Sequence, residues 1–273
     1  EHMNLVKLDL GNFEVRNHLF EAVRSWVANF NIDGIRLDAA DCLDFAFLAE
    51  LSRFCKSLKP DFWLMGEVIH GDYTRWAGAG MLDSVTNYEA HKGLWSSLND
   101  ANYFEIAYAL KRQSGQSGVY KHLSLYNFVD NHDVNRVAST LNNSAHLFPL
   151  HIMLYTMPGV PSIYYGSEFG VKGIKIGGDD APLRPHLPLQ GLQDNPPAPD
   201  LMKTIQRLSA IRKEQEALRR GDYRELFVSH KQMAFERQSG SQTVIVAVNA
   251  EDQEAWIDIP ISGTFADHLN PEA

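Results

Sequence analysis

Three acidic residues follow apolar segments of the chain, at points where buried strands would end. Asp38 and Glu67 come directly after such segments, and Asp133 lies a few residues beyond a third one. Carboxyl groups at strand ends can act as nucleophile, general acid or general base, and a pair of them is the usual machinery of glycoside hydrolysis. These three positions are therefore the candidates for chemistry.

Arg36 and Asp38 lie on one face of a predicted strand, because side chains alternate along a strand with a period of two. A neighbouring guanidinium favours an ionised carboxylate, which a nucleophile at an anomeric carbon requires. Glu67 ends an otherwise apolar strand, and partial burial favours the protonated form that a general acid needs. Both positions also have structural interpretations, as an ion pair at the rim of a sheet and as a surface carboxylate.

The run Asp130-Asn131-His132-Asp133 places four polar residues after another predicted strand. Asp133 is a candidate to hold sugar hydroxyls and to stabilise charge that develops at the anomeric carbon. His132 is a candidate donor to a substrate oxygen. A single histidine is more often a structural residue, but four polar residues in a row at a strand end favour a functional site.

The elements that must position these residues alternate between short apolar strands and amphipathic helices. Alternation of this kind fits an open doubly wound sheet or a closed (β/α)8 barrel. No glycine-rich phosphate loop follows a strand, and Asp38 and Glu67 are separated by about one barrel unit of roughly 31 residues. We therefore expect a barrel. Its strands are predicted at 35–38, 62–68, 82–86, 125–129 and 162–165, and its helices at 42–58, 103–111, 146–155 and 200–218.

Only five of the eight strands of a barrel can be found, so residues 1–220 are interpreted as the C-terminal portion of one, about strands 4 to 8. Three further units would need roughly 90 residues upstream. After Gly221 the pattern changes to short alternating segments at 224–228, 233–236, 243–248 and 255–259. Residues 221–273 are therefore predicted to form a small, incomplete antiparallel β-sandwich domain.

Composition excludes several classes of protein. The formal net charge of −9 over 273 residues argues against nucleic acid as a partner, and no apolar run approaches the roughly 20 residues of a membrane span. Cys42 and Cys55 would lie about 20 Å apart on one helix, beyond disulfide reach. We expect neither a disulfide nor a cysteine metal site, and we expect a cytoplasmic location.

The segments that contain Asp38, Glu67 and Asp133 together resemble three signature regions of the α-amylase family of retaining glycoside hydrolases, in the family's order and at its spacing. A fourth segment is similar to the family's eighth strand, and the resemblance covers about residues 5–260. The four segments are Gly34-Ile35-Arg36-Leu37-Asp38-Ala39-Ala40-Asp41, Gly66-Glu67-Val68, Phe128-Val129-Asp130-Asn131-His132-Asp133 and Gly159-Val160-Pro161-Ser162-Ile163-Tyr164-Tyr165-Gly166-Ser167-Glu168.

The resemblance implies a catalytic role for each of the three acidic residues. Asp38 would form the covalent glycosyl intermediate, Glu67 would act as acid and then as base, and Asp133 would stabilise the oxocarbenium-like transition state. The two carboxyl groups of a retaining enzyme lie about 5–5.5 Å apart. The implied substrate is an α-linked glucan or maltooligosaccharide.

The resemblance also implies a set of residues that bind or orient. Arg36 would orient the nucleophile, and His132 would bind the sugar beside the cleaved bond. Asn131 and Arg136 are the other expected contacts with substrate.

The chain departs from the family pattern in two ways. The first signature region is absent, together with the domain that usually interrupts the barrel. A calcium site in many members draws on those parts, so we expect no metal and no cofactor in this chain, calcium being an option only for a full-length protein. Asp41-Cys42 replaces a Lys-His pair of many starch-degrading members, and Val68 stands where some oligosaccharide-acting members have Trp. Amylase, neopullulanase or cyclomaltodextrinase-like activity and α-glucanotransfer all stay open.

Two rival interpretations come from other classes. A non-catalytic amylase-like accessory protein would typically lack one or more catalytic carboxylates, whereas all three are present here. A metal-dependent hydrolase with Asp38, Glu67, His132 and Asp133 as ligands would need more histidines.

A five-stranded part of a barrel is not closed and therefore has two unpaired strand edges. It leaves open edges near Ile35 and Ile163, which tend to pair with other chains. We expect the chain alone to be inactive, and to form a homo-oligomer or bind a companion carrying the N-terminal half.

Overall fold

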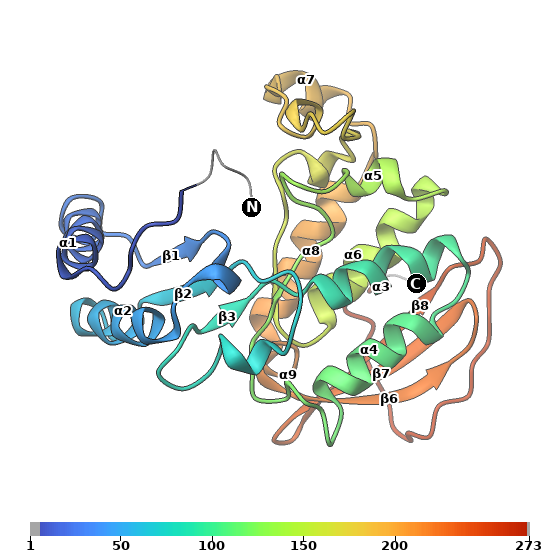
Figure 1. Cartoon of the computed structure of the whole chain (residues 1–273). Helices are drawn as coiled ribbons and strands as arrows, with labels where there is room; N and C mark the ends of the chain where they lie inside the picture. The colour runs from blue at the N-terminus through green and yellow to red at the C-terminus, as the bar shows by residue number, and fades with distance from the viewer. Residues whose placement is uncertain (1–5, 272–273) are drawn as a thin grey trace. The chain divides into compact units, whose positions relative to one another are not determined.

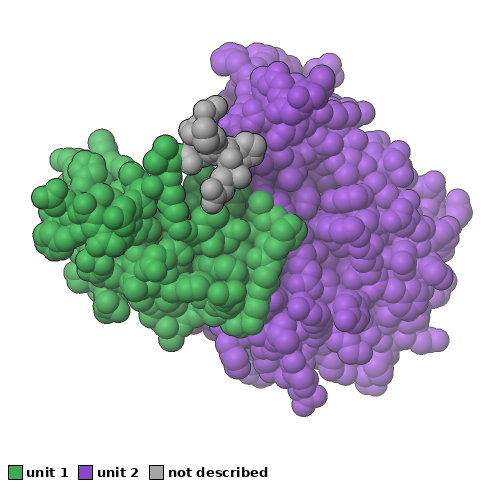
Figure 2. All heavy atoms as spheres, in the orientation of Figure 1, with its two compact units in different colours: residues 1–86 green, residues 87–273 purple. Residues whose placement is uncertain are grey.

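The computed structural model describes residues 6–271. The chain forms two compact units, Glu1–Thr86 and Asn87–Ala273, which Figure 2 shows in different colours. We call them the first unit and the second unit and describe each by itself.

The first unit is a parallel sheet flanked by helices. The sheet has the order β1-β2-β3, and α1 and α2 lie side by side (Figure 1). Its elements are α1 (Phe13–Phe30), β1 (Gly34–Leu37), η1 (Ala40–Cys42), α2 (Phe45–Leu58), β2 (Trp63–Gly66), η2 (Tyr73–Arg75) and β3 (Ser84–Val85).

Local sequence explains where α2 begins and how closely the sheet packs. Asp44 caps the helix, because its side chain accepts from the backbone N–H of Phe47 at 3.0 Å. Gly66 is required by close approach, since a Cβ there would lie 2.5 Å from Leu82 Cδ1 and 2.8 Å from Ala40 Cβ. The end of β2, which Glu67 follows, is thereby packed tightly.

The second unit combines one further parallel strand pair, several helices and an antiparallel sheet of order β6-β7-β8. Its main elements are α3 (Tyr88–Asn99), α4 (Phe104–Ser114), β4 (Tyr126–Asn127), α5 (Val137–Thr140), α6 (Leu147–Thr156), β5 (Val160–Pro161), η4 (Ser167–Phe169), α7 (Leu189–Asp194), α8 (Leu201–Glu214), α9 (Glu216–Arg220), β6 (Asp222–Val228), β7 (Gln232–Ser239) and β8 (Gln242–Asn249). Two short 3-10 turns, η3 (Ser144–His146) and η5 (Ala181–Leu183), lie in its loops.

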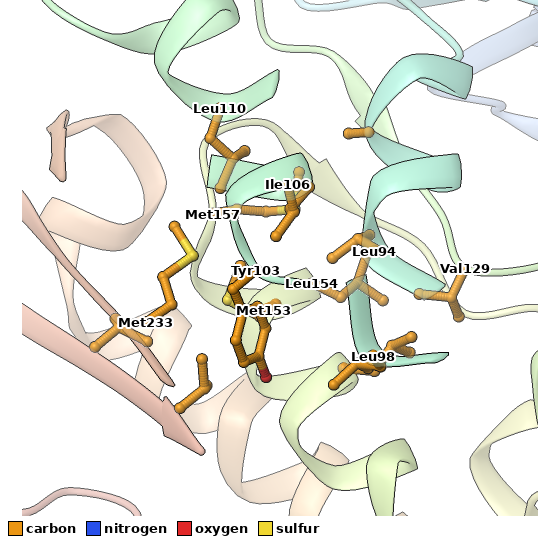
Figure 3. Close-up of a cluster of buried hydrophobic side chains, with 14 of the residues drawn as sticks. Leu94, Leu98, Tyr103, Ile106, Leu110, Val129, Met153, Leu154, Met157 and Met233 are labelled. Atoms are coloured by element: carbon orange, nitrogen blue, oxygen red, sulfur yellow. The ribbon is translucent and has the colours of Figure 1, made fainter. Parts of the chain in front are cut away.

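One hydrophobic core joins the helices of the second unit to its antiparallel sheet. Leu94 of α3, Ile106 of α4 and Leu154 of α6 belong to the same buried cluster as Met233 of β7 (Figure 3). Phe235 of β7 is a further member of this cluster. Full burial of each such side chain contributes about 1.5–3 kcal/mol. The sheet begins at Asp222, yet its buried face packs on helices, and the division at residue 220 into a barrel portion and a separate β domain stays a prediction.

Buried Arg237 joins this sheet to helix ends, and half-buried Arg212 contacts one of the same carbonyls. Arg237 of β7 is 1% exposed and donates to the carbonyls of Thr156, Leu218 and Gly221. Arg212 of α8 donates to the same Leu218 carbonyl at 2.8 Å. Cationic donors at helix C-terminal carbonyls are favourable, because those carbonyls lack partners within the helix.

Three expected elements differ from the sequence prediction. The helix expected at 200–218 is broken at Gln215, whose extended backbone separates α8 from α9. This break lets Ala217 and Leu218 become buried. The strand expected at 162–165 lies earlier, because Val160 and Pro161 pair with β4.

The strand expected at 255–259 is not formed. The alternation there finds no neighbouring strand among the described residues, and Trp256 is 96% exposed. Helix α3 was not predicted, although Asn87 caps it by accepting from the backbone N–H of Ala90. Within the described part of the chain, Cys42 and Cys55 are free thiols, and none of the helices is long and apolar enough to cross a membrane.

Candidate active site

The register of the first sheet brings Asp38 and Glu67 next to each other. Leu37 at the end of β1 is paired with Gly66 at the end of β2. Beyond the strands, the backbone N–H of Glu67 donates to Leu37 O and that of Ala40 donates to Glu67 O, both at 2.8 Å. The two acidic residues that follow the strands therefore lie at one edge of the sheet, as the sequence predicted.

Arg36 contacts both carboxylates through a single nitrogen. Its Nη2 lies 3.0 Å from Glu67 Oε1 and 3.6 Å from Asp38 Oδ1. The sequence predicted the pair with Asp38, but the shorter contact is with Glu67. The reason is geometric, since Arg36 precedes Leu37 in β1 and Glu67 follows Gly66, which pairs with Leu37 on the adjacent strand.

The two carboxylates differ in exposure. The Asp38 side chain is 85% exposed, whereas that of Glu67 is only 10% exposed and its Oε2 accepts from the backbone N–H of Ala39 at 3.4 Å. Ala39 has a φ of 44°, a left-handed conformation that costs a non-glycine residue energy and often marks functional sites. One open and one enclosed carboxylate on a shared cation suit a nucleophile and an acid/base.

An apolar groove of about 990 Å³ opens beside Asp38 in the first unit. It is bounded by α1, by β1 and by α2. Its lining includes Leu19, Val23, Trp26, Ile35, Leu37, Asp38, Cys42, Phe47 and Leu51.

In the second unit the loop after β4 holds Asn131, His132 and Asp133 in a defined turn. Asn131 Oδ1 accepts from the backbone N–H of Asp133 at 2.8 Å and from that of Val134 at 3.0 Å. His132 Nε2 lies 3.1 Å from Asp133 Oδ2. The structure thus brings together the three polar residues that the sequence selected here.

Arg184 is a residue of this cluster that the sequence did not indicate. Its Nη2 lies 3.2 Å from Asp133 Oδ1 and 2.6 Å from Asp180 Oδ2, and its Nε donates to the carbonyl of His132 at 3.3 Å. Both oxygens of Asp133 therefore have a cationic or imidazole neighbour. A single arginine in a glycine-rich loop about 50 residues away carried no signal in the sequence.

Arg136, an expected substrate contact, is buried among loops of the second unit. It is 0% exposed, and its guanidinium donates to the carbonyls of Tyr165 and Leu183 and stacks 4.2 Å from the ring centre of Tyr164. The guanidinium is thus enclosed by these loops, and the contact with substrate expected for Arg136 stays a prediction.

Asp130 is the other buried charge near this loop. Burial raises the pKa of its carboxyl, and the hydrogen bonds from the Val137 N–H and the Ser167 hydroxyl and the charge of Arg136 oppose that shift. Among residues 6–271, no group of three or more His, Cys, Asp or Glu side chains is arranged to hold a metal ion.

The candidate residues thus form two clusters, with Asp38, Glu67 and Arg36 in the first unit and Asn131, His132 and Asp133 in the second.

Comparison with known proteins gives consistent matches. Residues 1–187 match the family described as "Alpha amylase, catalytic domain". A cyclomaltodextrinase of Geobacillus thermopakistaniensis is 29% identical over 93% of this chain and 43% of the relative. Neopullulanase 2 of Thermoactinomyces vulgaris is 30% identical over 97% of this chain and 46% of the relative. The crystal structure of an Anoxybacillus α-amylase superposes with a TM-score of 0.78 at 27% identity, over 90% of this chain and 54% of that one.

The chain spans less than half the length of the curated relatives it matches and about half of the solved α-amylase. The predicted fold class is confirmed as part of a (β/α)8 barrel followed by an antiparallel sheet.

Proposed function

This chain belongs to the α-amylase family, and from that premise we propose that it carries the catalytic carboxylates of a retaining glycoside hydrolase. The proposed substrates are α-glucosidic bonds in starch-like glucans or maltooligosaccharides. The observation that carries the proposal is the contact of Arg36 Nη2 with both Asp38 and Glu67.

In the proposed first step, Asp38 attacks the anomeric carbon and the glycosidic C–O bond breaks. Glu67 gives its proton to the departing oxygen, so the leaving group departs as an alcohol. In the second step Glu67 takes a proton from water, whose oxygen attacks the anomeric carbon and releases the Asp38 carboxylate. Two displacements at one carbon retain its configuration.

The residues of the second unit complete the proposal. Asp133 would hold sugar hydroxyls and stabilise the positive charge of the transition state, and His132 and Asn131 would bind the same sugar. Arg136 would hold the surrounding loops in place through its hydrogen bonds to the carbonyls of Tyr165 and Leu183, because its side chain is fully buried.

The test is activity of the full-length gene product on maltooligosaccharides. Asp38→Asn should abolish hydrolysis, and the first product of the wild type should be the α-anomer by NMR. Asp61→Asn, an exposed residue before β2, is the matched control and should keep full activity. A β-anomer, or unchanged activity in Asp38→Asn, would disprove the retaining mechanism.

Specificity within the family is a further part of the proposal. The relatives are described as a cyclomaltodextrinase and a neopullulanase, so cyclodextrins and pullulan are the first substrates to compare with maltooligosaccharides. Longer oligosaccharides among the products would indicate glucanotransfer. A complete absence of cleavage, with glucan binding retained, would favour a non-catalytic accessory protein.

The apolar groove of the first unit supports a proposal about partners. β1 stands at the end of the sheet order β1-β2-β3, and the groove beside it is lined by Leu19, Val23 and Trp26 of α1. We expect it to receive a further parallel strand and helix from a companion segment. Size-exclusion chromatography of the chain alone and with that segment tests this, and a dimer of the chain alone would favour a second copy as the occupant.

A cytoplasmic location stays a prediction from the sequence.

A further inference from the structure

Three buried polar side chains at the ends of the loop that carries Asp133 and in η4 are joined by hydrogen bonds. Asp130, Ser167 and Arg136 are 2%, 1% and 0% exposed. Ser167 Oγ lies 2.7 Å from Asp130 Oδ2 and 2.9 Å from Oδ1, and it accepts from Arg136 Nη1 at 3.4 Å. One hydroxyl therefore bridges a buried carboxylate and a buried guanidinium. Removing such charges from water costs several kcal/mol for each ion unless they are well paired.

The carboxylate end of this bridge closes the loop. Asp130 Oδ2 also accepts from the backbone N–H of Val137 at 2.8 Å, which ties the two ends of the loop together. Inside the loop, Asn131 Oδ1 accepts from the backbone N–H of Asp133. The backbone position of Asp133 therefore depends on where Asp130 is held.

The guanidinium end of the bridge holds the partner of Asp133. Arg136 Nη2 donates to the carbonyl of Leu183 at 2.9 Å. The next residue, Arg184, pairs with Asp133 Oδ1 at 3.2 Å. The backbone of Asp133 and the cation that pairs with its side chain are thus joined through Ser167.

We propose that Ser167 is a positioning residue, whose hydroxyl joins Asp130 to Arg136 and so aligns Asp133 with Arg184. This inference rests on the proposed function, because it needs Asp133 at the sugar-binding site. Ser167 itself is buried and does not contact substrate. It acts only through the residues on either side of it.

Loss of the hydroxyl has a defined physical effect. The Asp130 carboxylate would lose the donation from Ser167, one of the interactions that oppose its raised pKa. It would then take up a proton or shift toward another donor, and the loop would move with it. A displacement of about 1 Å in a group that acts in the transition state costs about 10²-fold in rate.

The test compares Ser167→Thr with Ser167→Val in the full-length gene product. The two variants have nearly the same shape, and only the threonine keeps a hydroxyl. We expect Ser167→Thr to keep most of kcat, and Ser167→Val to lose about 10²-fold in kcat with little change in KM, because the effect lies in the transition state. Equal kcat in the two variants would overturn the inference.

Further variants keep the result interpretable. Ser167→Ala adds no atoms, so it gives the same test if the variants with the larger threonine or valine side chain do not fold. Wild-type kcat in Ser167→Ala also overturns the inference. The wild type and Asp38→Asn are measured alongside. Full activity of Asp38→Asn, or none in the wild type, would defeat the proposed function and this inference with it, whereas an unaffected Ser167 variant defeats the inference alone.

Discussion

Arg36 should act on catalysis mainly through Glu67 rather than through Asp38. The contact with Asp38 is 3.6 Å long and that side chain is 85% exposed, so solvent reduces its contribution to under about 1 kcal/mol. The contact with Glu67 is 3.0 Å long and that side chain is 10% exposed. A hydrogen bond to a charged group contributes about 1.5–3 kcal/mol. Together they amount to about 3 kcal/mol, or about 10²-fold in kcat/KM.

The assay for Arg36→Met uses two substrates that differ in their leaving group. Departure of a sugar needs a proton from Glu67, whereas 4-nitrophenolate leaves without one. We therefore expect Arg36→Met to lose about 10²-fold in kcat/KM on maltotriose, and far less on a 4-nitrophenyl α-maltoside. Arg53→Met, at an exposed position of α2, is the control. Equal losses on both substrates would refute the reasoning and place the effect on Asp38.

The predictions for three buried residues concern stability and can be measured by urea or thermal unfolding. Arg237→Met should cost about 3 kcal/mol, because it leaves buried carbonyls without a donor, while Arg220→Met at an exposed position should cost little. Tyr103→Phe should stabilise the protein by about 1 kcal/mol, since its buried hydroxyl has no hydrogen-bond partner among the described residues. Burial also raises the pKa of Tyr103, so the wild type should lose stability above about pH 10 more steeply than the variant. Burial lowers the pKa of His151 to about 4, so stability present above about pH 6.5 should fall by about 3 kcal/mol toward pH 4 and His151→Gln should reduce that slope. Wild-type values in these variants would contradict the assigned contacts.

The sequence located those functional and capping residues that stand at the ends of recognisable strands and helices. Asp38 and Glu67 could be located because each ends an apolar strand, and the parallel register then places them together. The helix cap at Asp44 is likewise a local signal. Such features depend on residues close together in the chain.

What the sequence could not predict depends on distant partners. The pairing of Arg184 with Asp133 joins residues about 50 positions apart, and the burial of Arg136 is decided by the loops that fold over it. The alternation at 255–259 had the right residues for a strand, but a strand needs a neighbour to pair with. The two clusters of candidate residues fall in different compact units, and their joint action remains a proposal.

The common interior of helices and antiparallel sheet limits how the gene can be shortened. A product that stops at residue 220 would uncover the sides of α4 and α6 that now pack against β6 and β8, and would remove Met233, Phe235 and Val246 from the shared core. The excised sheet would in turn display those same side chains to water. Exposed apolar patches promote aggregation, so expression trials should keep residues 87 to 249 together.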